Sequence, residues 1–528
     1  MNTTPWWQQS VCYQIYLPSF CDGNHDGLGD FPGLLTRLDY LAELGVGAIW
    51  ITPFYPSPLV DNGYDISDYC AVDPRFGDMG DFRRVVAGCH ARGIRVIIDL
   101  VVNHVSSEHL WFKDAWNNPA SRYRDYFIFT DQPNNWQSFF SGSAWTAEPD
   151  TGQYYYHKFA PQQVDLNWAN PQVEREIRQV IDFWIAQGVD GFRFDVINFL
   201  TTDGILADNP EENGEQRHDH DINQPGIIGA LQRLCRYVRQ RGDVFLIGEI
   251  GSEDLSVLRR YQSPQLMDVV FNFNLGSQKT FDAARLFAEL DAMRQQQSGL
   301  PTLFFSSHDM SRMISRFGES ERDVARARAV LALQLTASGV PFIFQGEELG
   351  LTDYRPQSIG QVFDIQGRTH YQTALDNGMA PDQALAVAVA QSRDGSRAPL
   401  PWSDGDYAGF SSVAPWMPID ARTQALNAAA QQQDAASLWH EYRQLIALRN
   451  ATDALRQGRY STLELTHSCI WFSRETAEEQ VWVAINFGEP VLNPWRDIAA
   501  DILSGDDATW IAKNQFLIKR SRHGKAQS

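Results

Sequence analysis

The chain has 528 residues, too many for one simple core, so two or three domains are expected. Its hydrophobic content of 43% and charged content of 21% are typical of a soluble globular protein. The formal net charge of −21 disfavours nucleic acids and anionic membranes as partners, because their phosphates would be repelled, whereas a neutral ligand remains compatible.

Strand-like and helix-like segments alternate from the start of the chain. Continuous apolar runs such as residues 94–102 are typical of strands buried on both faces. The eight predicted strands are residues 13–16, 47–51, 94–102, 191–194, 244–248, 267–271, 302–305 and 342–344. The predicted helices are residues 34–44, 81–92, 171–187, 226–240, 321–337 and 434–449. This alternation predicts an α/β protein built on a (β/α)8 TIM barrel.

Two segments interrupt the alternation. Residues 105–166 are rich in Trp, Tyr, Phe, Asn and Pro, and so long an interruption after the third strand predicts an inserted lobe, domain B. Residues 349–417 are expected to form an irregular subdomain. Short alternating segments from about residue 452 predict a small C-terminal antiparallel β domain. The predicted organisation is a barrel over 1–104 and 167–451, domain B over 105–166, and the β domain over 452–528.

Cellular location is predicted from targeting signals and cysteines. Residues 1–10 contain neither a basic start nor an apolar run, so we expect no signal peptide. No stretch reaches the roughly 18 apolar residues of a membrane span. The six cysteines lack metal-ligand spacing and are predicted to be free thiols in a reducing compartment. We therefore expect a cytoplasmic protein, a monomer or a weak homo-oligomer, that does not associate with membranes.

Three acidic residues, Asp195, Glu249 and Asp309, each follow a short apolar run. The ends of parallel barrel strands converge on one face, where catalytic groups collect. Carboxylates crowded there have different pKa values, which suits acid and base roles. An acid in such a place can also cap the next helix. Because the chain has three such acids, and two of them have Arg or His nearby in the sequence, a catalytic role is favoured over helix capping.

The neighbours of two of these acids suggest different protonation states. Arg193 and Asp195 lie two apart on one strand, so their side chains leave on the same face. An adjacent Arg keeps a carboxylate ionised, as a glycosidase nucleophile must be, although the pair could also be structural. Apolar neighbours would raise the pKa of Glu249 and keep it protonated, as a general acid must be.

Four blocks of the sequence resemble the signature blocks of the α-amylase superfamily, glycoside hydrolase family 13. They are Asp99 to His104, Gly191 to Asp195, Glu249, and His308-Asp309. Further segments resemble the oligo-1,6-glucosidase and α-glucosidase branch: Tyr13-Gln-Ile-Tyr16, Asp26-Gly-Leu-Gly-Asp30, Asp61-Asn-Gly-Tyr-Asp65, Val164-Asp-Leu-Asn-Trp168 and Ser392-Arg-Asp-Gly-Ser-Arg397. The resemblance implies that Asp195 is the nucleophile, Glu249 the acid/base and Asp309 the transition-state stabiliser of a retaining glycosidase.

The resemblance also implies a substrate-binding set. Asp61 and Tyr64 would hold the non-reducing glucose, and either Arg393 or Arg397, with Arg393 preferred, would pair with Asp61. That pair would close the far end of the pocket and leave room for one glucose, the physical basis of exo-action. The full expected set is Asp61, Tyr64, His104, Phe140, Phe159, Arg193, His308 and Arg393.

A loop near the N-terminus places oxygen-bearing residues at alternate positions, as a Ca²⁺-binding loop does. The loop is not an EF-hand, because Gly33 occupies the position of the final glutamate. An Asx-rich turn is the alternative. The resemblance supports a structural Ca²⁺ site, with Mg²⁺ possible. The expected ligands are Asp22, Asn24, Asp26, the carbonyl of Leu28, and Asp30.

The family resemblance and the residue after the nucleophile guide the functional prediction. Val196 resembles the α-1,6-preferring members, although the Trp that many of them carry two residues after the acid is absent. We predict an exo-α-glucosidase acting on short oligosaccharides, with α-1,6 bonds favoured over α-1,4. A transglycosylase or sucrose isomerase would use the same residues. A trehalose-phosphate hydrolase would need a basic pocket, and a non-enzymatic transporter subunit would lack the acids.

Overall fold

The computed structural model describes residues 4–296, 299–320 and 322–523. Its centre is a nearly closed barrel of parallel strands in the order β13-β12-β9-β3-β2-β1-β15-β14. The strands are β1 (Cys12–Ile15), β2 (Ala48–Ile51), β3 (Arg95–Leu100), β9 (Gly191–Phe194), β12 (Phe245–Gly248), β13 (Val269–Val270), β14 (Thr302–Leu303) and β15 (Val340–Phe344). Almost every residue in them is buried, as their continuous apolar runs predict. The predicted TIM barrel is confirmed.

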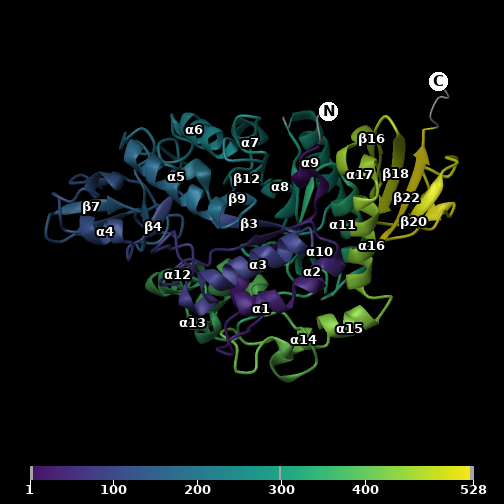
Figure 1. Cartoon of the computed structure of the whole chain (residues 1–528), viewed down its shortest axis with the longest axis horizontal. Coiled ribbons are helices and arrows are strands. Elements are labelled where there is room, and N and C mark those ends of the chain that lie inside the picture. The colour runs from purple at the N-terminus through teal and green to yellow at the C-terminus, as the bar shows by residue number, and fades with distance from the viewer. Residues whose placement is uncertain (1–3, 297–298, 321, 524–528) are drawn as a thin grey trace.

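Helices surround the barrel and connect successive strands (Figure 1). They are α2 (Leu38–Leu44), α3 (Met79–Ala91), α5 (Pro171–Ala186), α6 (Ile227–Arg239), α7 (Leu255–Tyr261), α8 (Phe273–Gly276), α9 (Ala283–Gln296), α10 (Met313–Phe317), α11 (Val324–Thr336) and α16 (Leu438–Asn450). The predicted helix over 34–44 is wrong in one respect. A separate helix α1 (Phe31–Thr36) precedes α2, and the non-helical backbone of Arg37 (φ −111°, ψ 6°) separates the two helices.

The segment between β3 and β9 carries small antiparallel sheets instead of a single crossover helix. Its elements are β4 (His104–Ser106), α4 (Leu110–Ala115), β5 (Phe129–Thr130), β6 (Trp145–Glu148), β7 (Gln153–Tyr156) and β8 (Gln163–Asp165). Strand β4 pairs with β8, and β7 lies between β5 and β6. After β9, the chain also forms the hairpin β10 (Glu211–Glu212) and β11 (Glu215–Gln216).

The C-terminal part is antiparallel and lies at the opposite end of the molecule from β4 and β7 (Figure 1). Its main sheet has the order β16-β17-β18-β22-β20, and β19 pairs with β21 beside it. The bounds are α17 (Asp453–Gln457), β16 (Arg459–Thr466), β17 (Cys469–Glu475), β18 (Glu479–Asn486), β19 (Val491–Leu492), β20 (Asp501–Gly505), β21 (Trp510–Ile511) and β22 (Gln515–Arg522).

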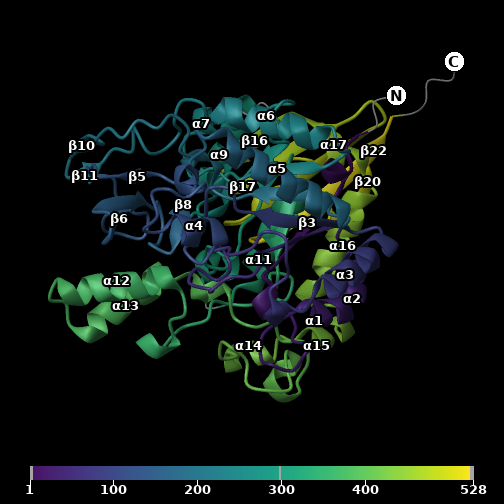
Figure 2. The same ribbon diagram turned by 60° about the vertical axis from the view of Figure 1, so that its left-hand side comes forward.

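The prediction that residues 349–417 are irregular is wrong for their central part. The helices α12 (Ile365–Asp376) and α13 (Pro381–Gln391) lie side by side and project from the barrel (Figure 2). Each helix buries only two residues, which are glycine or alanine, so the sequence lacks the apolar periodicity that reveals a core-facing helix. Two shorter helices follow them, α14 (Ala421–Gln424) and α15 (Ala428–Gln433).

Two global features bear on the predicted location. Among the described helices, none combines the length and hydropathy that crossing a bilayer requires. All six cysteines lie in the described residues, and each is a free thiol.

Candidate active site

The three predicted acids line one cavity of about 590 Å³ at the carboxyl ends of the barrel strands. Asp195 directly follows β9 and Glu249 directly follows β12, and these two strands are neighbours with Phe194 opposite Gly248. Asp309 reaches the same cavity from the loop after β14. The topology therefore brings together side chains that are up to 114 residues apart in the sequence.

One buried guanidinium joins the acids of neighbouring strands. The Nη1 atom of Arg193 lies 2.5 Å from Oδ1 of Asp195 and 2.5 Å from Oδ1 of Asp99, near the end of β3. Its Nη2 atom lies 2.5 Å from Oε2 of Glu249. Arg193 is 2% exposed, so water screens these contacts little. A single positive charge is therefore shared by three carboxyl groups.

The surroundings of the three predicted catalytic acids shift their pKa values differently. Burial, reinforced by the charge of Asp195, raises the pKa of Glu249 to about 8. Burial also raises the pKa of Asp195, but Arg193 opposes this effect and the pKa is about 6. Burial alone would raise the pKa of Asp309, yet its hydrogen bond with His308 and two nearby arginines hold that pKa well below its ordinary value. At neutral pH this arrangement gives one protonated and two ionised carboxyl groups.

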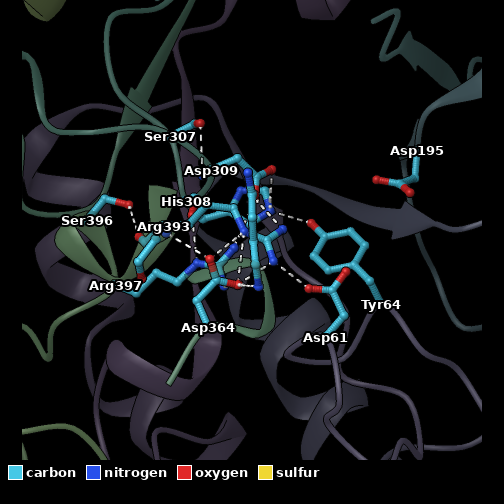
Figure 3. Close-up of polar contacts among 12 residues, drawn as sticks. Asp61, Tyr64, Asp195, Ser307, His308, Asp309, Asp364, Arg393, Ser396 and Arg397 are labelled. Carbon is cyan, nitrogen blue, oxygen red and sulfur yellow. Dashed lines mark hydrogen bonds and ion pairs between the residues drawn. The ribbon is translucent and has the colours of Figure 1, made fainter. Parts of the chain in front are cut away.

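Asp61, Arg393 and Asp309, which line the cavity, belong to a network of charged side chains (Figure 3). The Nη2 atom of Arg393 lies 2.6 Å from Oδ1 of Asp61 and 2.5 Å from Oδ1 of Asp364. Arg397 instead contacts Asp309, with 2.9 Å between Nη2 and Oδ1. Of the two arginines left open by the sequence, Arg393 therefore makes the pair with Asp61.

The histidines and Tyr64 lie against this network. The hydroxyl of Tyr64 is 2.6 Å from Nε2 of His308, and the two rings are stacked with centroids 5.5 Å apart. Burial lowers the pKa of both His104 and His308 to about 4, so both rings are neutral at pH 7. Neutral imidazole both donates and accepts hydrogen bonds, which suits contact with a hydroxyl.

Aromatic rings form another wall of the cavity. Phe140 and Phe159, both predicted from sequence, pack with ring centroids 5.6 Å apart, and Phe199 packs on Phe159 at 5.7 Å. Val196 joins this cluster. Its backbone is left-handed (φ 39°, ψ 46°), which is rare for a β-branched residue, and its N–H donates to Oε2 of Glu249 over 3.2 Å.

Sequence reasoning missed Asp364, which is fully buried and caps the N-terminus of α12. Besides its ion pair, it accepts a hydrogen bond from the backbone N–H of Arg393 over 2.8 Å. It therefore positions Arg393 toward Asp61. An Asp directly before a helix is a signal for an N-cap residue, but the sequence of α12 lacks the apolar periodicity that would have revealed the helix. Other missed residues that line the cavity include Gln137, Lys158, Gln163, Phe199, His218 and Ile222.

The predicted cation loop has a mixed donor set. Asp22 and Asp30 accept backbone hydrogen bonds within the loop, including His25 N–H to Asp22 at 2.7 Å and Gly33 N–H to Asp30 at 2.6 Å. In the described residues, no basic side chain forms an ion pair with Asp22, Asp26 or Asp30. No group of three or more His, Cys, Asp or Glu side chains in the described parts of the chain is arranged to hold a metal. A site here would therefore depend on the Asn24 amide and the Leu28 carbonyl as well.

Comparison with known proteins agrees with this geometry. The family described as "Alpha amylase, catalytic domain" matches residues 14–458. The chain is 37% identical over 512 residues to trehalose-6-phosphate hydrolase of Escherichia coli (strain K12), covering 93% of this chain and 92% of that protein. It is 36% identical over 509 residues to oligo-1,6-glucosidase of Parageobacillus thermoglucosidasius, covering 92% and 91%.

Solved structures give the same result. Trehalose-6-phosphate hydrolase of Bacillus licheniformis has a TM-score of 0.89 and 33% identity, covering 98% of this chain and 100% of that one. A trehalulose synthase has a TM-score of 0.91 and 34% identity, with coverage of 98% and 100%. The matched family spans most of the chain, including all three strand-end acids. The chain therefore belongs to the α-amylase family of glycoside hydrolases.

Proposed function

We propose that the protein is a retaining exo-α-glucosidase that releases terminal glucose from the non-reducing end of short α-linked oligosaccharides. The observation that carries the proposal is the closeness of two carboxyl groups in different protonation states. Asp195 and Glu249 contact one guanidinium, and a hydrogen bond from Glu249 lowers the pKa of Asp195. Inverting enzymes separate their carboxyls by roughly 6.5–9.5 Å to admit a water, and groups this close favour the retaining mechanism.

The roles follow from charge. Ionised Asp195 attacks the anomeric carbon and forms a covalent glycosyl ester, while protonated Glu249 donates its proton to the leaving oxygen. Water then hydrolyses the ester, with Glu249 acting as the base. Asp309, ionised at every working pH, stabilises the oxocarbenium-like transition state and holds sugar hydroxyls.

Exo-action is supported by the closed end of the cavity. The Asp61–Arg393 pair is bound on its outer side by Asp364, so a second sugar beyond the terminal glucose would have to displace three charged groups. Separating such buried pairs is costly, because each uncompensated charge stays buried. The pocket therefore favours a chain end over an internal unit.

A preference for α-1,6 bonds is supported by relatives that are named oligo-1,6-glucosidase and by Val196. Val196 lies beside both acids, and its branched side chain narrows the space next to the reacting bond. We expect Val196→Ala to raise kcat/KM for maltose relative to isomaltose by about tenfold. Steady-state assays on both disaccharides measure the ratio, and an unchanged ratio would contradict a role of Val196 in linkage choice.

The direct test of the function is a substrate panel. Purified protein is incubated with isomaltose, maltose, sucrose, trehalose and trehalose 6-phosphate, and the products are separated by chromatography. The proposal expects glucose as the first product, with isomaltose cleaved faster than maltose. Isomeric disaccharides from sucrose would instead indicate the alternative, a sucrose isomerase or transglycosylase using the same residues. A lack of activity on every neutral disaccharide would refute the proposal.

The pKa shifts predict a bell-shaped pH dependence. Activity needs Asp195 ionised, so it rises as the pH passes about 6. It also needs Glu249 protonated, so it falls as the pH passes about 8. The observed values belong to the interacting pair, because the two groups titrate together. The measurement is kcat/KM for isomaltose against pH, with a maximum expected near neutrality. A profile that keeps rising with pH would contradict the acid role of Glu249.

We further propose that the Asp22–Asp30 loop binds Ca²⁺ or Mg²⁺, which would offset the repulsion among its three carboxylates. Saturating calcium is expected to raise Tm over that in chelator, since a ligand at a hundred times its Kd stabilises a fold by about 2.7 kcal/mol. Asp26→Asn, at an exposed ligand position, should reduce this shift. Equal Tm values with calcium and chelator would contradict the site.

We also propose a cellular location and an oligomeric state for the protein. The six free thiols support a reducing, cytoplasmic location. A monomer or weak homo-oligomer is proposed, and sedimentation velocity over a range of concentrations tests it. Cell fractionation tests the location.

A further inference from the structure

The loop between β9 and α6 covers part of the cavity and packs on the inserted segment. Its residue Asn209 exchanges two hydrogen bonds with Asn135. Asn135 Nδ2 donates to the Asn209 carbonyl over 2.8 Å, and Asn209 N–H donates to Asn135 Oδ1 over 2.8 Å. Trp136 Nε1 donates to the carbonyl of Ala207 over 2.9 Å, and Gln216 Nε2 donates to the carbonyl of Asn135 over 2.7 Å. Two segments that are about 75 residues apart thus form one continuous wall.

A compact charged cluster lies where these segments meet. The Nζ atom of Lys158 is 2.6 Å from Oδ2 of Asp221, and both side chains are almost fully buried, at 1% and 0% exposed. Nδ1 of His218 lies 3.1 Å and 3.0 Å from the two carboxylate oxygens of Asp221. Asn209 Nδ2 donates to Oδ1 of Asp221 over 2.9 Å. Asp221 is thus held by three side chains.

This bonding leaves one polar atom of the cluster for a ligand. Nδ1 of His218 also lies 3.4 Å from Nζ of Lys158, a longer contact than the two with the oxygens of Asp221. We therefore assign the proton of the neutral ring to Nδ1, which leaves Nε2 as an acceptor. No described residue hydrogen-bonds to Nε2, and His218 lines the cavity. Lys158 also lines the cavity, but its charge is compensated by Asp221 at 2.6 Å.

The Lys158–Asp221–His218 cluster is separate from the residues that are proposed to hold the terminal glucose. Arg393 contacts both Asp61 and Asp309 at the proposed glucose-binding end. Lys158, Asp221 and His218 make no ion pair or hydrogen bond with those three residues. The cavity-lining residues that Lys158 contacts are instead Phe199, whose ring centroid is 5.8 Å from Nζ, and Gln137, whose carbonyl accepts from Nζ over 3.1 Å. This part of the cavity remains for the leaving group.

We propose that His218, held by Asp221 and Lys158, binds a hydroxyl of a neutral leaving sugar and that this subsite rejects a phosphorylated one. The proposal rests on the proposed function and specifies its substrate class. Both Lys158 and Arg393, the lysine and arginine among the described lining residues, are paired with carboxylates. Four acids also line the cavity, namely Asp61, Asp195, Glu249 and Asp309. A phosphate would therefore meet net negative charge and no uncompensated cation.

The cluster also differs from a phosphate site in its fixed geometry. A phosphate is bound by donors that are free to point at it, usually Arg forks or backbone N–H groups. Here the ammonium of Lys158 donates to Asp221 and to the carbonyl of Gln137 at 3.1 Å. Recruiting that ammonium would leave Asp221 buried without its counter-ion, which is strongly unfavourable.

The first experiment compares matched substrates. Maltose and trehalose are each compared with the derivative that carries a 6-phosphate on the leaving glucose. We expect the phosphate to lower kcat/KM of the wild-type enzyme roughly 100-fold or more, because the phosphate would be buried without a free cation to pair with it. Equal or higher kcat/KM for a phosphorylated substrate would overturn the proposal. If no neutral α-glucoside is cleaved at all, the proposed function itself fails, which is a separate outcome.

The second experiment changes the cluster. Asp221→Asn removes the counter-charge of Lys158 and should shrink the phosphate penalty about tenfold, as the gain of one charge contact does. The double variant Lys158→Met with Asp221→Asn is the matched control, because it keeps the Asn but removes the cation, and it should restore the penalty. A penalty that is the same in all three proteins would overturn the charge argument.

A third variant keeps the proposal testable should the buried pair be needed for folding. His218→Ala should raise KM for maltose about fivefold, as the loss of one hydrogen bond does. The rise should be smaller for methyl α-glucoside, because its methyl aglycone carries no hydroxyl that Nε2 could bind in the intact substrate. Equal changes for the two substrates, or no change for maltose, would overturn the role of His218.

Discussion

An Asp195→Ala variant is expected to release nitrophenol from nitrophenyl α-glucoside on the order of 10⁴-fold more slowly than the wild type, as loss of a catalytic nucleophile does. Without the carboxylate no glycosyl ester forms, and the remaining groups only bind and polarise the substrate. The measurement is kcat from initial rates at saturating substrate. Residual turnover within tenfold of the wild type would contradict the assignment of Asp195.

The chain offers a matched control for this variant. Asp190 immediately precedes the same strand β9, at its other end, and pairs with Arg95 at 2.8 Å and with His90 at 2.7 Å. It does not line the cavity. Asp190→Asn should therefore leave kcat close to the wild-type value, and any change should be in Tm. Equal losses in both variants would mean that the first loss came from a damaged fold.

A Glu249→Gln variant is expected to separate substrates by the quality of their leaving groups. Isomaltose releases a poor leaving group that needs a proton, so its kcat/KM should fall about 10³-fold, within the usual range for a general acid. Nitrophenolate leaves without protonation, so kcat/KM for the nitrophenyl substrate should be much less affected. The measurement is the ratio of kcat/KM for the two substrates in the variant and in the wild type, because kcat/KM does not include hydrolysis of the ester, in which Glu249 acts as the base.

The same variant has a second readout. Because Gln cannot titrate, the fall in kcat/KM above pH 8 that Glu249 causes on isomaltose should vanish, while the rise near pH 6 that Asp195 causes should remain. A pH profile with its upper fall intact would assign that fall, and the acid role, to another group. This result would be informative even if the loss of activity were large.

The barrel and its acids were predictable because they depend on local patterns. Continuous apolar runs identified the eight strands, and strand-end positions identified Asp195, Glu249 and Asp309. Arg193 was predictable because a spacing of two places side chains on one face of a strand. These relations span a few residues and do not depend on the rest of the fold.

Other features depend on contacts that spacing cannot reveal. Asp61 and Arg393 are 332 residues apart, so the choice between Arg393 and Arg397 needed the fold. Asp364 was missed because α12 packs mainly on α13 through small residues and shows no apolar stripe. The paired state of Lys158 was also hidden, because Asp221 and His218 belong to the irregular segment between β11 and α6.

The shared guanidinium has a consequence for timing within the proposed catalytic cycle. When Asp195 becomes an ester it loses its negative charge, and with it the repulsion that helps to raise the pKa of Glu249. Arg193 then faces one anion fewer, so its attraction for an ionised Glu249 grows. Bond formation at one carboxyl group thereby makes the other a stronger proton donor for departure and then a stable anion that can activate water. The switch of Glu249 from acid to base therefore needs no movement of the backbone, because Arg193 stays in place and its positive charge is shared by fewer anions.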